Sequence, residues 1–190
     1  MLLLVGLGNP GSNYSNTRHN IGFKIIDAIN AHFKLSKQKP KFKGLLTTGN
    51  IDEKKIYAIK PLTFMNNSGT AIKELIDYFK IDAKDVIVFH DDMDIDFGKV
   101  KAKFGGTSAG HNGIESIDKF IGKDYSRVRI GIGHPKQKKK VNSHVLEDFK
   151  EDEEEKIKEI TENIVKQIPT LIDKKIDLFS SKVNQNLNGI

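Results

Sequence analysis

The sequence of 190 residues contains no cysteine and no tryptophan, and only three of its 31 basic residues are arginine. The absence of cysteine excludes disulfide bonds, thiol nucleophiles and Cys-ligated metals. The sequence also has no leader pattern and no apolar run long enough to cross a membrane, which predicts a soluble cytoplasmic protein. Its length fits a single domain over residues 1–190 with a sizeable core, ending in a loose tail from about residue 180.

Negative charge is scarce outside one short block. Residues 147–155 carry a net charge of −6, so the rest of a chain with a formal net charge of +6 carries +12. Such an excess indicates a polyanionic partner, although a lysine-rich composition alone produces the same balance. A basic loop over 134–143, with Lys136 and the lysines at 138–140, is either solvated surface or a flap over that partner.

The first chemically informative stretch is the polar turn from Gly6 to Gly22. The apolar run over 2–5 predicts a buried strand before it, and apolar residues four positions apart from Ile21 onward predict a helix after it. Ligands bind beyond the carboxyl ends of strands in open α/β sheets. In this turn, His19 is the side chain that can exchange a proton near neutral pH. The simpler alternative is a surface histidine in a glycine-rich turn.

The glycines of this turn, Gly6, Gly8 and Gly11, match the spacing G-x-G-x-x-G of dinucleotide-binding loops. Such a loop needs a helix to begin at its last glycine, because the helix N-terminus binds the pyrophosphate. Pro10 disfavours helix at the residue before it, and the polar run continues for several residues more. The pattern therefore argues against a dinucleotide site.

The rest of the chain alternates between strand and helix patterns, which predicts an α/β fold. Two strands over 45–51 and 55–60 form a hairpin that Pro61 ends. The remaining patterns predict strands over 85–89, 99–104 and 127–133, helices over 72–79 and 114–121, and a long helix from the acidic block to Phe179 that Pro169 kinks or divides.

Four polar loops follow predicted strands, and loops at one edge of a mixed sheet converge. They carry Asn9 with His19, Asn66, Asp91 and Asn112. The carboxylates of Asp91, Asp92 and Asp94 have two interpretations: ligands for a divalent metal, or an acceptor that orients a histidine ring for base catalysis. The glycine-rich loop over 105–113 is suited to an anion, but no Gly-Lys-Ser/Thr closes it as in a Walker loop.

Taken together, these segments resemble one known family. The motifs Gly-Leu-Gly-Asn-Pro-Gly, Thr-Arg-His-Asn, Lys-Pro-Leu-Thr-Phe-Met-Asn, Asp-Asp-Met-Asp, Gly-His-Asn-Gly and Arg-Val-Arg-Ile-Gly-Ile-Gly occur in order between Leu2 and about Phe149. In this order and spacing they are similar to those of the bacterial peptidyl-tRNA hydrolases. The resemblance implies a monomeric, three-layer α/β/α sandwich around a mixed, mostly parallel twisted sheet, of the phosphorylase/hydrolase-like kind. It also implies hydrolysis of the ester between an N-blocked peptide and the 3′ end of tRNA, which recycles tRNA from stalled translation.

The resemblance also implies roles for individual residues. The catalytic group of the family matches His19, Asp91 and Asn9. The tRNA-contacting positions match Tyr14, Phe64, Asn66 and Asn112, and the phosphate-binding ones match Lys103 and Arg129. Further residues inside matched motifs are Arg18, Asn20, Met65 and His111. A water activated by His19 suffices for an ester, so neither a metal nor a cofactor is expected.

The sequence departs from the family pattern at a few positions. Ala109 stands where the family has glycine, and alanine does not adopt a positive φ cheaply. Asp96 replaces a frequent proline, and Met93 and Ile95 replace leucines. Two other functional classes remain open from the residues alone: a non-catalytic RNA-binding protein of the same fold, and a nucleotide- or phosphate-handling α/β enzyme.

Overall fold

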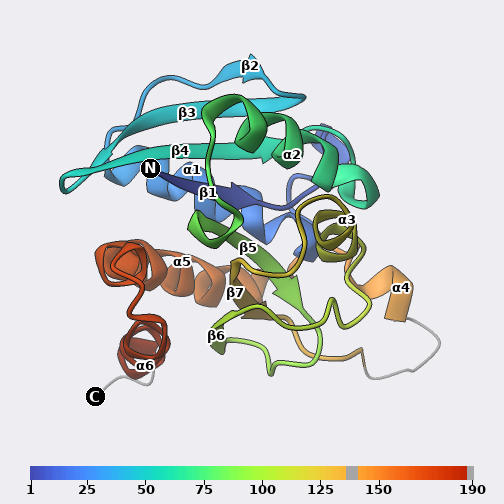
Figure 1. The fold of residues 1–190 in the computed structure, drawn as a ribbon. Coiled ribbons are helices and arrows are strands. Elements are labelled where there is room, and N and C mark those ends of the chain that lie inside the picture. The colour runs from blue at the N-terminus through green and yellow to red at the C-terminus, as the bar shows by residue number, and fades with distance from the viewer. Residues whose placement is uncertain (136–140, 188–190) are drawn as a thin grey trace.

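A computed structural model describes residues 1–135 and 141–187, and the prediction for the lysines at 136–140 lies outside them. Within these ranges, seven strands form one sheet in the order β2-β3-β4-β1-β5-β7-β6 (Figure 1). The strands are β1 (Leu2–Gly6), β2 (Lys39–Lys41), β3 (Gly44–Ile51), β4 (Lys54–Pro61), β5 (Val86–Asp92), β6 (Val100–Phe104) and β7 (Ser126–Gly131).

The sheet is mixed, as expected. The central strands β4, β1, β5 and β7 run parallel to one another. Toward one edge, β3 pairs antiparallel with β4 and the edge strand β2 pairs antiparallel with β3, and at the other edge β6 pairs antiparallel with β7. The carboxyl ends of β1 and β5, which the sequence predicts to carry functional loops, therefore lie side by side at the same edge of the sheet.

Helices cover both faces of the sheet. They are α1 (Ile21–His32), α2 (Ser68–Phe79), α3 (Asn112–Ile121), α4 (Val141–His144), α5 (Glu151–Ile172) and α6 (Ile176–Leu187). On one face, α1 packs on β1, β4 and β5, α5 packs on α1, and α6 packs on β6. On the other face, α2 and α3 pack against each other (Figure 1). The result is the expected arrangement of one mixed sheet between two helical layers.

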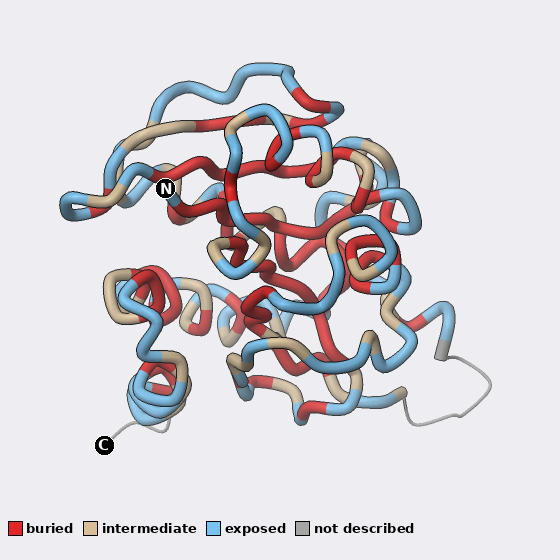
Figure 2. Tube along the Cα trace, viewed as in Figure 1, coloured by how far each residue is buried: buried red, intermediate tan, exposed pale blue. Residues whose placement is uncertain are grey.

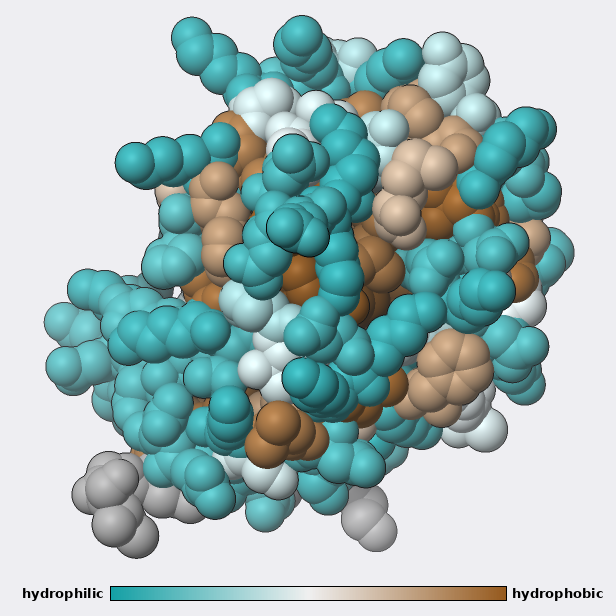
Figure 3. Space-filling view, turned by 60° about the vertical axis from the view of Figure 1, so that its left-hand side comes forward, coloured by the Kyte–Doolittle hydropathy of each residue, from teal (hydrophilic) through white to brown (hydrophobic). Residues whose placement is uncertain are grey.

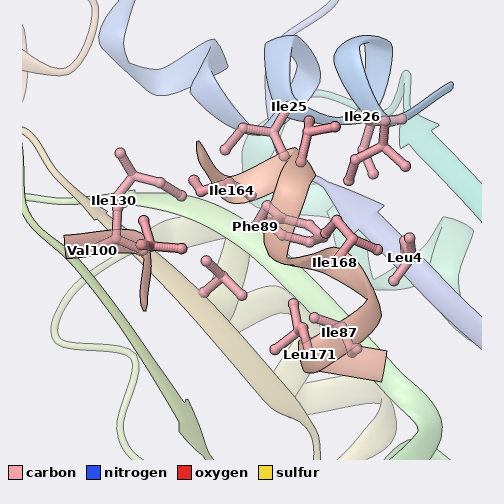
Figure 4. Packing of buried hydrophobic residues seen from close by; sticks show 14 of the residues in the cluster. Leu4, Ile25, Ile26, Ile87, Phe89, Val100, Ile130, Ile164, Ile168 and Leu171 are labelled. Atoms are coloured by element: carbon pink, nitrogen blue, oxygen red, sulfur yellow. The ribbon is translucent and has the colours of Figure 1, made fainter. Parts of the chain in front are cut away.

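Alternating strand side chains supply two cores, one on each side of the sheet. Leu4, Ile87 and Phe89 face α1 and α5, where they meet Ile25 and Ile164 (Figure 4). The intervening residues of the same strands face α2 and α3. Figure 2 shows the central strands buried and the connecting loops largely exposed. Because both faces are covered, β1 and β5 are continuous apolar runs rather than alternating ones.

The C-terminal part differs from the sequence-based expectation. The predicted loose tail from residue 180 is wrong for the described residues, because Phe179, Val183 and Leu187 are buried on one face of α6. Asn184 fixes this helix to the edge strand by hydrogen bonds with the backbone N–H and C=O of Val100. The expected division of the long helix occurs, but after Ile172 rather than at the proline.

The short strand β2 was not among the predicted strands either. The hairpin of β3 and β4 is confirmed. No helix within residues 1–135 and 141–187 has both the length and the apolar character needed to span a membrane. One face of the molecule, seen in Figure 3, is mostly hydrophilic with hydrophobic patches between polar side chains.

Candidate active site

Close packing of glycines brings the histidine-bearing turn to the end of β5. A Cβ on Gly22 would collide with the backbone N of Leu7 and the backbone O of Phe89, and a Cβ on Gly6 would collide with Gly22 itself. The start of α1 therefore lies directly on β1 and β5. The glycines serve this contact, and α1 begins only at Ile21, well past Gly11, which agrees with the argument against a dinucleotide loop.

The predicted partners His19 and Asp91 are in direct contact. Nδ1 of His19 lies 2.8 Å and 3.0 Å from the two carboxylate oxygens of Asp91. Their side chains are only 9% and 1% exposed. Because a carboxylate accepts hydrogen bonds, Nδ1 carries the proton, and the lone pair of Nε2 remains available as a base.

A second histidine completes the surroundings of Asp91. Nε2 of His111 lies 2.9 Å from the same carboxylate, while Nδ1 of His111 accepts hydrogen bonds from the backbone N–H groups of Gly113 and Ile114. His111 is thus the N-cap of α3, and this capping fixes the tautomer with the proton on Nε2. Asp91 therefore receives a hydrogen bond from each of two imidazoles.

The protonation of this cluster follows from its burial and charges. Burial alone would raise the pKa of the Asp91 carboxyl, but His19 and His111 outweigh that effect and hold this pKa well below its usual range. Burial, reinforced by the neighbouring His111, lowers the pKa of His90 well below its usual value. His90 continues β5 and donates from Nδ1 to the backbone O of Asp91, so it is a structural residue of the strand.

The predicted Asn9 is oriented from two sides. Its backbone N–H donates to Oδ1 of Asn20 and its backbone O accepts from Nδ2 of Asn20, at 2.8 Å and 2.9 Å. Oδ1 of Asn9 accepts from the backbone N–H of Met65 at 2.8 Å. This bond turns the Nδ2 amide group of Asn9 toward the cavity that Asn9, Met65 and His19 line.

That cavity has a volume of about 720 Å³, and most of the predicted residues border it. Those on its wall are Asn9, His19, Phe64, Met65, Asn66, Asp91 and Asn112, together with His111, Met93, Val145 and Leu146 among others. Tyr14 lies beside it, with its ring 6.4 Å from that of Phe64 in an edge-on contact. The exposed side chains of Asn66 and Asn112 offer amide groups on the rim.

The two predicted phosphate-binding residues lie next to the cavity rather than on its wall. Nε of Arg129 lies 2.7 Å from the carboxylate of Asp92, which does line the cavity. Lys103 belongs to the adjacent strand β6, and partial burial together with Arg129 and Arg127 lowers its pKa. The other arginine of β7, Arg127, is only 1% exposed and donates to Asp118 and the backbone O of Thr107.

The three carboxylates of the acidic motif have separate partners. Asp91 contacts the histidines, Asp92 contacts Arg129, and Asp94 contacts Nε2 of His134 at 2.8 Å. Among the described residues, the group with suitable metal-binding geometry is His19, Asp91 and His111, whose candidate ligand atoms lie within 4.8 Å of one another. In both histidines, the nitrogen atom that faces Asp91 already donates a hydrogen bond to its carboxylate.

The loop before α3 is strained at the position where the sequence departs from the family pattern. Ala109 has a φ of 48°, and its glycine neighbours Gly105, Gly106 and Gly110 have φ of 67°, 107° and 79°. The left-handed region costs a non-glycine residue roughly 1–2 kcal/mol. The loop thus keeps the shape that glycine would allow, with Ala109 on the cavity wall.

Two features of the site were missed in the sequence. The contact of His111 with Asp91 was not anticipated, although its motif directly precedes a helix and so could have suggested a capping role. The segment from His144 to Phe149 was not expected at the site, yet Val145 accepts a hydrogen bond from the backbone N–H of His19 and lines the cavity. That contact depends on tertiary pairing, for which the local sequence carries no pattern.

Comparison with known proteins agrees with this geometry. The family model described as "Peptidyl-tRNA hydrolase" matches residues 3–189. The peptidyl-tRNA hydrolase of Pelagibacter ubique is 73% identical over 184 residues, covering 97% of this chain and 99% of that protein. The one from Bartonella henselae is 46% identical over 189 residues, covering 100% and 98%. A crystal structure of the Acinetobacter baumannii peptidyl-tRNA hydrolase superimposes with a TM-score of 0.90 at 33% identity, covering 97% of this chain and 94% of that one. The chain therefore belongs to the peptidyl-tRNA hydrolase family.

Proposed function

We propose that this chain hydrolyses the ester bond that joins an N-blocked peptide to the 3′ end of a tRNA. The observation that carries the proposal is the pair His19 and Asp91, in contact at 2.8 Å on the wall of a cavity that several asparagine amides also line. A buried imidazole whose inner nitrogen donates to a carboxylate has its outer nitrogen positioned to act as a base.

The proposed reaction needs one activated water. Nε2 of His19 takes a proton from the water, and the water oxygen attacks the ester carbonyl carbon. The tetrahedral intermediate then collapses, the bond to the ribose oxygen breaks, and the imidazolium returns its proton to that oxygen. Asp91 fixes the ring and stabilises the imidazolium; base catalysis of this kind contributes ~10²–10⁴-fold. These steps use no metal, so EDTA is expected to leave turnover unchanged.

Asparagine amides are suited to hold the acyl part of the substrate. The Nδ2 group of Asn9 is directed to the cavity because its Oδ1 is bonded to Met65, so it can donate to the developing oxyanion or to a peptide carbonyl. Asn66 and Asn112 provide further donors and acceptors for the peptide and the 3′ end. One donor to an oxyanion is worth about 3 kcal/mol.

The tRNA is the proposed partner of the surface beyond Asp92. Arg129 and Lys103 would bind phosphate, and the rings of Tyr14 and Phe64 would contact the 3′ end at the rim of the cavity. Contacts of this kind neutralise the phosphate backbone of the tRNA without recognising its base sequence, so tRNA binding should weaken as the salt concentration rises. The enzyme would act as a monomer in the cytoplasm, where translation leaves such substrates.

The test is release of the N-acetyl-amino acid from N-acetyl-aminoacyl-tRNA, with free aminoacyl-tRNA as the control substrate. His19→Ala should lower kcat by ~10²–10⁴-fold while tRNA binding persists. Arg129→Ala should raise KM by about tenfold and leave kcat within about twofold, because it removes uniform binding.

Two results would contradict the proposal. Substantial hydrolysis by the His19→Ala variant would remove the imidazole from its role as base. Tight binding of tRNA by the unaltered protein without release of any product would favour the RNA-binding alternative, in which the buried pair has no chemical purpose.

A further inference from the structure

The turn that carries His19 is paired with a segment far away in the chain. The backbone N–H of His19 donates to Val145 at 2.8 Å, and that of Arg18 donates to Glu147 at 3.0 Å. The backbone N–H of Phe149 returns a bond to Asn16 at 3.3 Å. Residues 144–149, which we call the closing segment, therefore hold the backbone of the histidine turn and also form part of the cavity wall.

The side chain of Arg18 connects this pairing to the start of α5. Arg18 is 2% exposed, and its Nη2 lies 2.8 Å from a carboxylate oxygen of Glu153. Its Nη1 donates to the backbone O of Glu147 at 3.3 Å, and the guanidinium lies 5.6 Å from the centre of the Phe149 ring. The same oxygen of Glu153 accepts the backbone N–H of Lys150 and so caps α5.

Stability alone does not account for such a pair. A buried ion pair often stabilises a protein no more than well-packed apolar residues would, because both charges lose their hydration. Its distinctive property is a fixed geometry, because the planar guanidinium contacts each partner from a set direction. Here the partners are the carboxylate of Glu153, the backbone O of Glu147 and the ring of Phe149. Arg18 is adjacent to His19 in the chain, but it is buried and is not among the residues that line the cavity.

We infer that Arg18 is a positioning residue for His19: with Glu153, it fixes the histidine turn against the closing segment, so that the imidazole stays in register with Asp91. The inference rests on the proposed role of His19 as the base. A displacement of about 1 Å in a reacting group costs on the order of 10²-fold in rate. Loss of the guanidinium should therefore reduce the rate of the chemical step while leaving the tRNA-binding surface intact.

The experiment compares Arg18→Met and Arg18→Lys with the unaltered protein. Arg18→Met should lower kcat by about 10- to 100-fold and change KM by less than about threefold. Arg18→Lys should recover part of the rate, because it restores the charge but not the planar geometry. A spectroscopic measurement accompanies the kinetics: the downfield proton resonance of the His19 Nδ1–H bonded to Asp91 should broaden or vanish in Arg18→Met.

Two further variants separate positioning from general destabilisation. Lys54→Met removes a cation that holds the opposite end of α5, through the backbone O of Ile172 and the carboxylate of Asp173, and it should leave kcat and the resonance unchanged. Glu153→Gln should lower kcat less than Arg18→Met does, and the double variant should equal Arg18→Met alone, because both act through one contact.

The inference is overturned if Arg18→Met keeps kcat within about twofold with the resonance intact, or if its loss appears in KM alone. It is also overturned if Lys54→Met, at equal loss of thermal stability, reduces kcat as much. A failure of the proposed function gives a different result. In that case His19→Ala would remain active, independently of the resonance measured in Arg18→Met.

Discussion

The two walls of the cavity are built in opposite ways. Behind the wall that carries the proposed base, Thr17, Arg18, His19 and Asn20 are each at most 7% exposed, and the backbone of Arg18 and His19 is bonded to the closing segment. In the loop before α3, which contributes residues 108–110 to the cavity wall, residues 105–110 are exposed or half-buried, and Gly105, Gly106, Ala109 and Gly110 all have positive φ. One wall is backed by close packing, whereas the other is a turn-rich and largely exposed loop.

This difference matches the separate demands of chemistry and binding. Proton transfer and attack on the ester need a geometry accurate to a fraction of an ångström, which close packing provides. A loop that contacts the varied end of a substrate can tolerate small changes of shape, and such segments are usually drawn from the less stable parts of a fold. Predictions that disturb each wall in turn should therefore give effects of very different size.

The largest effect is expected at the carboxylate on which both histidines converge. Asp91→Asn keeps the size of the side chain, but its amide presents N–H groups to imidazole nitrogens that are themselves protonated. The histidine would then lose its fixed tautomer, and kcat should fall by ~10³–10⁴-fold. Steady-state hydrolysis of N-acetyl-aminoacyl-tRNA measures this loss, and a decrease of less than tenfold would mean that the ring is held by other groups.

The same variant should alter stability against acid. The pKa of Asp91 is held below its value in the unfolded chain, so its ionised form contributes stability that is complete above that value and lost as pH falls. The free energy of unfolding of the original protein should therefore decrease below about pH 4, and part of this decrease should be missing in Asp91→Asn. The free energy of unfolding of both proteins can be measured with urea from pH 7 to pH 3. If the carboxylate made no such contribution, the two free energies would decrease in parallel as the pH falls.

An intermediate effect is expected from placing one methyl group on each wall. In Gly22→Ala the new Cβ would collide with backbone atoms of Leu7 and Phe89, which cannot move without separating α1 from the sheet, and the loss should be about 3 kcal/mol or more. In Gly110→Ala the Cβ meets no atom within 4 Å, so only the strain at φ 79° remains, about 1 kcal/mol. Equal losses in chemical denaturation would refute the contrast between the walls.

The smallest effect is expected at the strained alanine of the loop. Ala109→Gly removes the strain of a positive φ but adds freedom to the unfolded chain, which leaves a net stabilisation of about 0.5 kcal/mol. The midpoint of urea unfolding should rise slightly, and kcat should stay the same because Ala109 does not touch the proposed base. A clear decrease in stability would show that the methyl group has a favourable contact that outweighs the strain.

The extent to which sequence predicted the fold depended on whether the signal was local. The apolar runs of β1 and β5 and the alternating pattern of the hairpin were correctly predicted, because burial imposes the pattern directly. The strand β2 was missed because Lys39, Pro40 and Lys41 are all exposed and form a strand only through pairing with β3. In α6 the apolar residues recur every four positions, but the Ser, Asn and Gln residues between them are typical of an unstructured chain end, and a loose tail was predicted for that reason.

The candidate site divides in the same way. The proximity of His19, Asp91, Asn9 and Asn112 could be predicted, because strand ends converge and the motifs resemble those of a known family. The double donation to Asp91 and the closing segment could not, because His111 and Val145 reach the site through tertiary contacts. The burial of Arg127 is a further example, because the pattern of β7 does not distinguish it from Arg129, two residues further along the same strand.

The neighbouring carboxylates at the end of β5 have a consequence for the spacing of the two proposed contacts with the substrate. Asp91 is bonded to the imidazole and Asp92, the next residue, to the guanidinium of Arg129. If Arg129 binds a phosphate of the substrate while His19 acts on the ester, the two protein contacts are separated only by the peptide unit between Asp91 and Asp92. This unit belongs to a central strand, which has no hinge at that point. The end of β5 would therefore keep the proposed base and the proposed phosphate contact at a constant separation.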